Sequence, residues 1–247
     1  YRDTLRDAAN GFIEALYGTG SSVALFSFGN ESPRSGTQNH PTPLNVDVAA
    51  NRTQLTNWVN NYWTYTVTNQ GTNWDAGLYA AAVGAQANNY DIVLVLTDGN
   101  PTFSNPGQAG SGSLTTFREL ERPIFSANAI KATGSRIVTV GIGSGLSAHN
   151  LAAVSGPNGY APGLTLNEVD YTIASWANLK PLLEEFAMGL TCEASIEVNK
   201  LVQEGAVTSP GAGWVFGTTA TAGTLDPNGQ QTTGETGKVD WGLSFTT

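Results

Sequence analysis

The sequence is poor in charge, cysteine and long apolar runs. Only 13% of its 247 residues are charged, against about 25% in an ordinary soluble domain. Asp and Glu outnumber Lys and Arg by 20 to 11, so the net charge is −9. The absence of a basic run argues against nucleic-acid binding, and an acidic surface argues against anionic membranes. No stretch of about 18 apolar residues occurs, so we expect no membrane insertion in this segment.

Sulfur and histidine chemistry are equally sparse. Cys192 is the only cysteine, so no internal disulfide can form. The two histidines, His40 and His149, lie far apart, and the G-x-S-x-G and H-E-x-x-H motifs and the P-loop are all missing. The glycines of residues 141–145 do not have dinucleotide-binding spacing. We therefore predict that the protein is not an enzyme. The low lysine content favours a secreted or wall-exposed protein, although genome composition would produce the same bias.

Apolar periodicity predicts an alternation of helices and strands over most of the chain. Helices are expected at residues 5–16, 52–62, 75–86, 117–132, 147–154 and 175–188, and strands at residues 22–28, 44–48, 92–96, 136–142 and 168–171. Several of these strands are unbroken apolar runs, which is typical of strands buried on both faces. The pattern predicts an α/β fold, doubly wound and Rossmann-like, with a mostly parallel sheet. Pro123 should kink or break the helix that contains it.

The pattern changes after Cys192. Val239, Trp241, Leu243 and Phe245 alternate with polar or small residues, which predicts antiparallel strands. We expect two domains, at residues 1–191 and 192–247, the second being an incomplete antiparallel β-sandwich. Tyr1 opens directly into a helical pattern, so the chain is expected to be an internal piece of a longer protein.

Two short strings place oxygen-bearing side chains at junctions between elements. Thr72, in the string at residues 71–78, precedes a predicted helix, and Asp98, in the string at residues 91–101, follows the most apolar strand. Such junctions gather at one edge of a parallel sheet. A hydroxyl and a carboxylate there suit a hard cation, Mg²⁺ or else Mn²⁺ or Ca²⁺. Taken singly, Thr72 would be read as a helix N-cap or turn residue and Asp98 as part of an ordinary turn.

Together the strings resemble the second and third metal loops of the von Willebrand factor type A family, in the form found in Gram-positive, above all actinobacterial, surface proteins. The resemblance implies that Thr72 and Asp98 bind the metal and that the metal bridges to a carboxylate of a protein ligand. The family's first metal loop, Asp-x-Ser-x-Ser on a central strand, has no counterpart in this sequence. We therefore expect a gap between the strands that begin near Ser22 and Ile92, and weak or absent metal binding by these 247 residues.

The segment from Asn100 to Ser113 is long for a connection in a compact domain. Because it follows Asp98 directly, we predict that it lies beside the metal and contacts the ligand, with Asn100, Thr102 and Phe103 as the candidate residues. A merely variable surface loop is the alternative.

Ile196, Val198, Lys200 and Val202 would share one face of a strand by period two. The string at residues 194–202 resembles the first strand of collagen-adhesin B-type domains. That resemblance implies that Lys200 is the amine donor of an intramolecular isopeptide bond, whose Asn partner would lie beyond Thr247. A lysine that reaches water from an edge strand is the other interpretation.

These resemblances predict a metal-dependent surface adhesion module on a β-sandwich stalk, in a secreted or cell-wall location. The alternative is a scaffolding protein whose type A domain assembles within its own complex and binds no foreign ligand.

Overall fold

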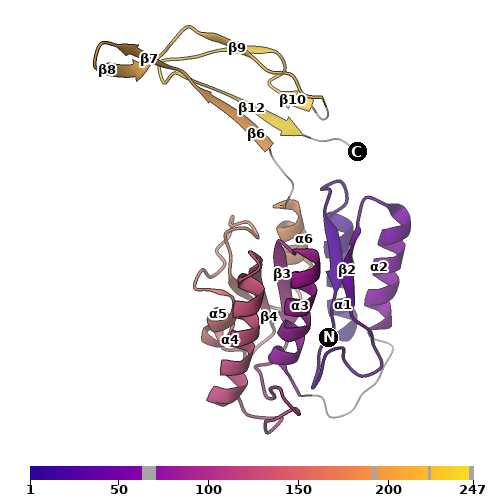
Figure 1. Ribbon diagram of the computed structural model, residues 1–247. Helices are drawn as coiled ribbons and strands as arrows, with labels where there is room; N and C mark the ends of the chain where they lie inside the picture. Colours follow the sequence, from indigo (N-terminus) through magenta and orange to yellow (C-terminus); the bar gives the residue numbers. More distant parts are fainter. Residues whose placement is uncertain (63–70, 191–193, 222–223, 245–247) are drawn as a thin grey trace. The chain divides into compact units, whose positions relative to one another are not determined.

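The computed structural model describes residues 1–62, 71–190, 194–221 and 224–244 (Figure 1). The chain divides into two compact units, Tyr1–Leu190 (unit 1) and Thr191–Thr247 (unit 2). Each unit is described by itself below. None of the helices in the described part of the chain has the length and apolar character that a bilayer crossing requires.

Unit 1 alternates helices and strands along the sequence, as expected. Its helices are α1 (Arg2–Ala15), α2 (Ala49–Asn61), α3 (Trp74–Asn88), α4 (Phe117–Lys131), α5 (Ala148–Ser155) and α6 (Leu179–Met188). Its strands are β1 (Ser22–Leu25), β2 (His40–Asn45), β3 (Ile92–Thr97), β4 (Arg136–Ile142) and β5 (Tyr171–Ala174).

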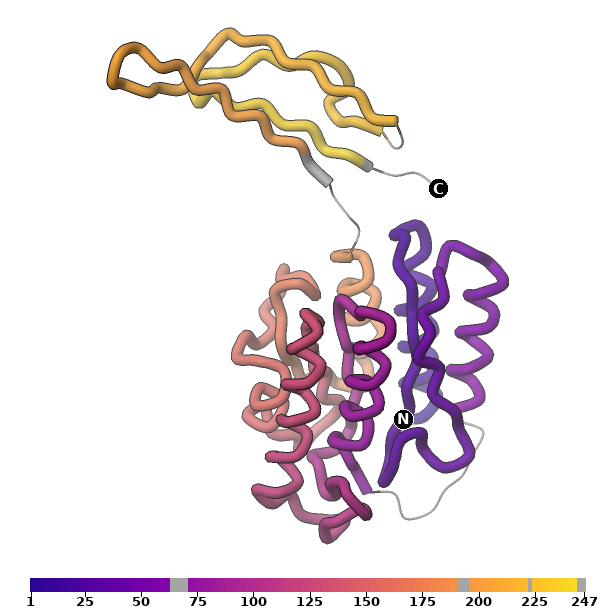
Figure 2. The backbone as a smooth tube through the Cα atoms, in the orientation of Figure 1, coloured from indigo at the N-terminus to yellow at the C-terminus, as the bar shows by residue number. Residues whose placement is uncertain are grey.

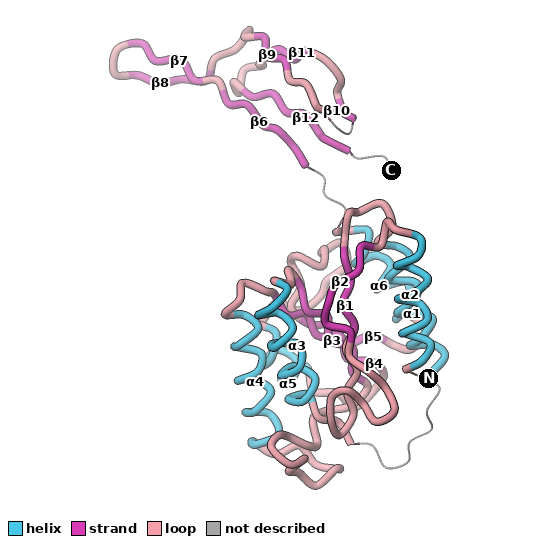
Figure 3. The backbone as a smooth tube through the Cα atoms, turned by 45° about the vertical axis from the view of Figure 1, so that its right-hand side comes forward, coloured by secondary structure: helices cyan, strands magenta, loops and turns pink. Residues whose placement is uncertain are grey.

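The sheet at the centre of unit 1 is parallel and has the order β3-β4-β5. Helices cover both of its faces, with α3, α4 and α5 on one side and α1 and α6 on the other (Figure 3). Two apolar clusters lie between these layers. In the first, Phe186 and Leu183 of α6 pack against β4. The second contains Ile130 of α4. This arrangement confirms the predicted doubly wound α/β class.

β1 and β2 form a separate antiparallel pair. β1 does not hydrogen-bond with β3, so among the described strands the sheet is divided between the strands that begin at Ser22 and Ile92, as predicted. Phe12 of α1 packs against the apolar clusters on both sides of this division. All residues of β3 up to Leu96 are only half-buried, although they are strongly apolar, because one edge of β3 pairs with no strand in the described part of the chain.

Two details of the predicted elements were wrong. Helix α4 runs without a break through Pro123, which lies in its second turn and is buried. Only the carbonyl of Glu119 loses its usual helical partner there, and a capping box at Thr116 and Glu119 stabilises the turn before it. The last strand of the sheet is Tyr171–Ala174 rather than residues 168–171, because its register is set by pairing with Thr139–Ile142 of β4.

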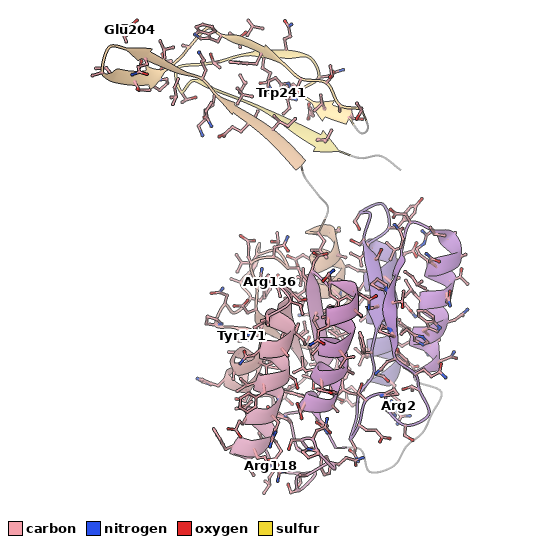
Figure 4. All side chains as sticks on the ribbon, in the orientation of Figure 1. Arg2, Arg118, Arg136, Tyr171, Glu204 and Trp241 are labelled. Carbon is pink, nitrogen blue, oxygen red and sulfur yellow. The ribbon has the colours of Figure 1, made fainter. Side chains whose placement is uncertain are left out.

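Unit 2 contains only short antiparallel strands in its described part. They are β6 (Ala194–Asn199), β7 (Leu201–Glu204), β8 (Val207–Pro210), β9 (Val215–Gly217), β10 (Thr224–Asp226), β11 (Gln230–Thr232) and β12 (Lys238–Ser244). The largest sheet has the order β10-β12-β6, and β7–β8 and β9–β11 form two-stranded pairs. Trp241, labelled in Figure 4, is buried with Leu225 and Val239, and together they form the core of this unit.

Candidate metal centre

The loops that hold the candidate residues lie at the carboxyl edge of the parallel sheet. β3, β4 and β5 end there at Thr97, Ile142 and Ala174. The described part of the loop before α3 reaches the same end of unit 1 as the loop after β3 (Figure 2). Because parallel strands present their carboxyl ends at one edge, residues far apart in sequence meet here.

Thr72 lies just before α3 but does not cap it. The N-cap is Asn73, whose Oδ1 accepts a hydrogen bond from the backbone N of Ala76 at 3.0 Å. The backbone of Thr72 is bonded to Thr102: its N donates to Thr102 Oγ1 at 2.9 Å, and its O accepts from Thr102 N at 2.7 Å. The hydroxyl of Thr72 makes no hydrogen bond with any described residue, so it is free to bind a ligand.

Asp98 follows the last residue of β3, and its side chain is exposed. Its carboxylate makes no hydrogen bond or ion pair with any described residue. The next residue, Gly99, approaches Thr72 so closely that a Cβ atom at this position would lie 2.9 Å from Thr72 Oγ1. The structure therefore brings the Thr72 hydroxyl against the turn that contains Asp98.

Trp74 connects the start of α3 to the turn after β3 by hydrogen bonds. Its indole Nε1 donates to Thr97 Oγ1 at 3.0 Å and to the carbonyl of Gly99 at 3.1 Å. The hydroxyl of Thr97 in turn donates to the same carbonyl at 2.9 Å. Trp74 is only 2% exposed, so its position is fixed by packing as well as by hydrogen bonds. The sequence carried one signal for this role, a tryptophan in the first turn of an Ala-rich helix.

The loop from Asn100 to Ser113 lies beside this centre, but its three candidate ligand residues are engaged within the protein. Asn100 donates to the carbonyl of Gly145 at 2.9 Å and accepts from the backbone N of Ser147 at 3.0 Å. Thr102 holds the backbone of Thr72. The ring of Phe103 covers Gly71, where a Cβ would lie 2.1 Å from Phe103 Cε2. These side chains position the loop.

The tip of the same loop is more open. Ser104 and Ala109 exchange backbone hydrogen bonds of 2.8 Å in both directions, so residues 104–109 form a small closed hairpin. Pro106, Gly107 and Gln108 at its tip are exposed. Residues 106–108 therefore offer a further exposed surface beside the three predicted positions, which are half-buried.

The donor set fits a hard cation in type but not in number. Mg²⁺ requires about six oxygen ligands and retains several waters. The free hydroxyl of Thr72 and the exposed carboxylate of Asp98 supply two. No cluster of three or more His, Cys, Asp or Glu side chains that could hold a metal occurs in the part of the chain that the structure describes. Thr72 and Asp98 are thus suited to complete a metal site but not to form a tight one alone.

Comparison with known proteins was made by sequence and by structure. No family model and no curated protein matches the sequence. The fold resembles that of a pilus adhesin. The open conformation of SpaC from Lactobacillus rhamnosus GG superposes with a TM-score of 0.57 and 14% identity over 99% of this chain and 35% of that chain. A second SpaC structure has a TM-score of 0.56 at 14% identity, over 98% of this chain and 36% of that chain.

A matrix protein of the mussel byssus, PTMP1, matches more weakly. Its TM-score is 0.49 at 18% identity, over 80% of this chain and 44% of that chain. A TM-score below 0.5 does not establish a shared fold. The chain spans less than half of the length of both proteins, and at 14% identity SpaC shows a shared fold and nothing more.

Lys200, the candidate in unit 2, approaches Gly211 from the same side as Val202, with which it was predicted to share a face. It occupies the single position between β6 and β7. Its backbone N donates a hydrogen bond to the carbonyl of Gly237, and its own carbonyl accepts one from the backbone N of Gly211. Its Nζ lies 4.2 Å from the centroid of the Trp214 ring, a cation–π contact. No described carboxylate forms an ion pair with it. Cys192 lies outside the described residues.

Proposed function

We propose that the chain is part of a cell-surface adhesion module that binds the acidic side chain of a protein ligand through a divalent cation. The observation that carries this proposal is the free hydroxyl of Thr72 against Gly99, in the turn that contains the exposed, unpaired Asp98 and that Trp74 holds through Thr97 and Gly99. The likeness to SpaC supports it at the level of the fold, since SpaC is a pilus adhesin.

Each residue has a distinct part in this proposal. Thr72 and Asp98 would hold the cation, which would offer an open coordination position to a carboxylate of the partner. Trp74 would fix the distance between the two loops, and Thr102 would fix the backbone of Thr72. The exposed tip at residues 106–108 would lie at the border of the contact surface. The acidic surface disfavours an acidic partner without a cation, so binding should be lost when the cation is chelated.

Calorimetric titration with Mg²⁺ tests the metal site. For these 247 residues we expect weak or undetectable binding, because two protein oxygens are too few. A second version is extended at its N-terminus by a strand that completes the sheet and supplies further oxygen ligands. This version should bind Mg²⁺ tightly, and the double substitution Thr72→Ala and Asp98→Ala should abolish the binding. Asp91→Ala, at the opposite end of β3 and also exposed, is the matched control. Micromolar affinity in the 247 residues would contradict the expected weak binding, and unchanged affinity in the double variant would contradict the assignment of the site to Thr72 and Asp98.

For unit 2 we propose a stalk in which Lys200 forms an isopeptide bond. The Lys200 amine would attack the side-chain amide of an Asn, forming a new amide bond and releasing ammonia. The intact mass of a version extended beyond Thr247 would then be lower by one ammonia, and Lys200→Arg would restore the full mass. An unchanged mass in the extended protein would reject this part. The contact of Lys200 with Trp214 would then be the whole function of the side chain.

A further inference from the structure

A small cavity of about 250 Å³ opens between α3, α4 and the hairpin tip of the loop after β3. Neither Thr72 nor Asp98 lines it, and it shares only Pro106 with the exposed tip that the proposed function uses. Asp75 lines it from the first turn of α3, and Tyr79 lines it from the next turn. Phe125 and Arg122 line it from α4, and Asn105 from the hairpin. The volume is that of one side chain rather than of a larger ligand.

A buried carboxylate lines the cavity. Asp75 is only 6% exposed. Its Oδ1 accepts from Ser126 Oγ at 2.6 Å and its Oδ2 accepts from the backbone N of Asn105 at 3.0 Å. Both donors are neutral, and no cation forms an ion pair with Asp75 in the described part of the chain. Each carboxylate oxygen can accept a second hydrogen bond. The site therefore favours a positively charged donor.

Aromatic side chains flank the opening. Tyr79 is 61% exposed and Phe125 is 59% exposed, so both rings are accessible to a bound group. Tyr79 lies one helical turn after Asp75, so both project from the same side of α3. Aromatic faces attract cations, and a bound group would also cover their apolar area. Two exposed aromatics beside a buried carboxylate form a setting that suits an ammonium or guanidinium group.

Among the described residues that line the cavity, Arg122 is the only positive group. It is exposed and forms no ion pair with a described residue. Its charge would oppose a second cation and would assist an anion. The effect of removing Arg122 therefore distinguishes a cation site from an anion site by its sign.

We propose that this cavity binds the charged end of a lysine or arginine side chain of a partner polypeptide. The carboxylate of Asp75 would accept hydrogen bonds from the cation, and Tyr79 and Phe125 would pack along its aliphatic stem. The net charge of −9 would favour the approach of a basic segment. The proposal stands on Asp75, the cavity and the two aromatics, and it is independent of any metal.

The test is an NMR titration of the isotope-labelled chain with Nα-acetyl-arginine methylamide. The neutral isostere Nα-acetyl-citrulline methylamide is the matched probe. We expect the arginine compound to shift the backbone amide of Asn105 in a saturable manner, with at least about tenfold weaker binding of the citrulline compound, since one charged hydrogen bond is worth about 1.5–3 kcal/mol. The lysine analogue should also bind.

Variants separate this site from general surface attraction. Phe125→Ala should weaken binding several-fold, while Phe117→Ala, which removes an even more exposed aromatic of α4 that does not line the cavity, should leave it unchanged. Arg122→Ala should strengthen binding. Phe125 and Arg122 are both exposed, so these variants should fold even if Asp75→Asn does not. Equal binding of the citrulline compound, weaker binding after Arg122→Ala, or equal losses in Phe125→Ala and Phe117→Ala would each overturn the proposal.

Discussion

Strand β4 of unit 1 is buried along six of its seven residues, whereas all four residues of β8 in unit 2 are exposed. The difference follows from what covers each sheet. Helices pack on both faces of the parallel sheet in unit 1, so its central strand is buried on both faces and mostly apolar. In unit 2, Trp241 and Val239 share one side of β12 by period two and supply most of the buried core.

A second contrast lies within unit 1. β3 is as apolar as β4, yet residues Ile92 to Leu96 are only half-buried while residues 137–142 of β4 are fully buried. β4 pairs on both edges and β3 on one. Apolar sequence therefore marks a strand, but burial also requires a neighbour on each side. Because burial differs between the two units and between the two strands, we expect substitutions in them to change stability by different amounts.

The largest effect is expected in the helical layer of unit 1. Phe186 is completely buried on α6 against β4 and its neighbours. Phe186→Ala should lower the free energy of unfolding of unit 1 by about 3–5 kcal/mol through lost burial and the cavity left behind. Thermal and denaturant unfolding would measure it. Met188 lies two residues later and is exposed, so Met188→Ala should change the free energy of unfolding little. A similar loss of stability in Met188→Ala would show that the loss in Phe186→Ala comes from the helix itself and not from the core contact.

In unit 2 a comparable substitution should have a local outcome. Trp241 is 1% exposed, and its indole donates to the carbonyl of Gly229 at 3.0 Å. Trp241→Ala should cost about 3 kcal/mol or more, which is enough to unfold a unit with so small a core. Amide hydrogen exchange should show loss of protection in β6 and β12 while β4 keeps its protection. Trp214→Ala, at a half-exposed position, is the control. Parallel loss in both units would mean that they do not fold independently.

A smaller effect is expected at the start of α4. Thr116 and Glu119 form its capping box, and the hydrogen bond from Thr116 is the main cause that lowers the pKa of Glu119. Thr116→Ala should cost about 1 kcal/mol at neutral pH. Because the folded-state pKa is lowered, the stabilisation is present above the unfolded pKa of Glu and is lost as pH falls through the folded pKa. The difference between Thr116→Ala and wild type should therefore shrink in acid. Thr53→Ala, an exposed position on α2, should show no such trend.

The smallest effect concerns His40 beside the β1–β2 pair. Its ring stacks on Trp58 at a centroid distance of 3.6 Å, and burial lowers its pKa from the usual 6.5. A lowered pKa means that the neutral form is favoured in the folded state. Its contribution is therefore complete above pH 6.5 and is lost as pH falls through the folded pKa. Relative to His40→Phe, the wild type should lose stability on acidification below neutrality. His149→Asn controls for loss of a histidine, and a rise in wild-type stability over this range would refute the assignment.

The candidate site shows how far sequence reasoning reached. Thr72 and Asp98 could be singled out because each stands at a junction between elements, and the structure brings the turn after β3 against the Thr72 hydroxyl. The role of Trp74 could not be read from its position, since its two acceptors, Thr97 and the carbonyl of Gly99, lie more than 20 residues away. The ligand contact of Asn100, Thr102 and Phe103 stays a prediction, and the structure adds that their side chains also contact neighbouring loops.

The amino-acid sequence by itself determined the class of fold and the position of its strongest elements. Arg136–Ile142 is a strand with the predicted bounds, because a segment that is apolar apart from Arg136 and Thr139 suits a strand covered on both faces. Tertiary structure alone decided what weaker local signals could not. It set the register of β5, carried α4 through Pro123 and placed Lys200 at a junction. It also joined Asp75 to Tyr79 and Phe125 around one cavity, because long-range packing determines which side chains meet once local patterns have formed the elements.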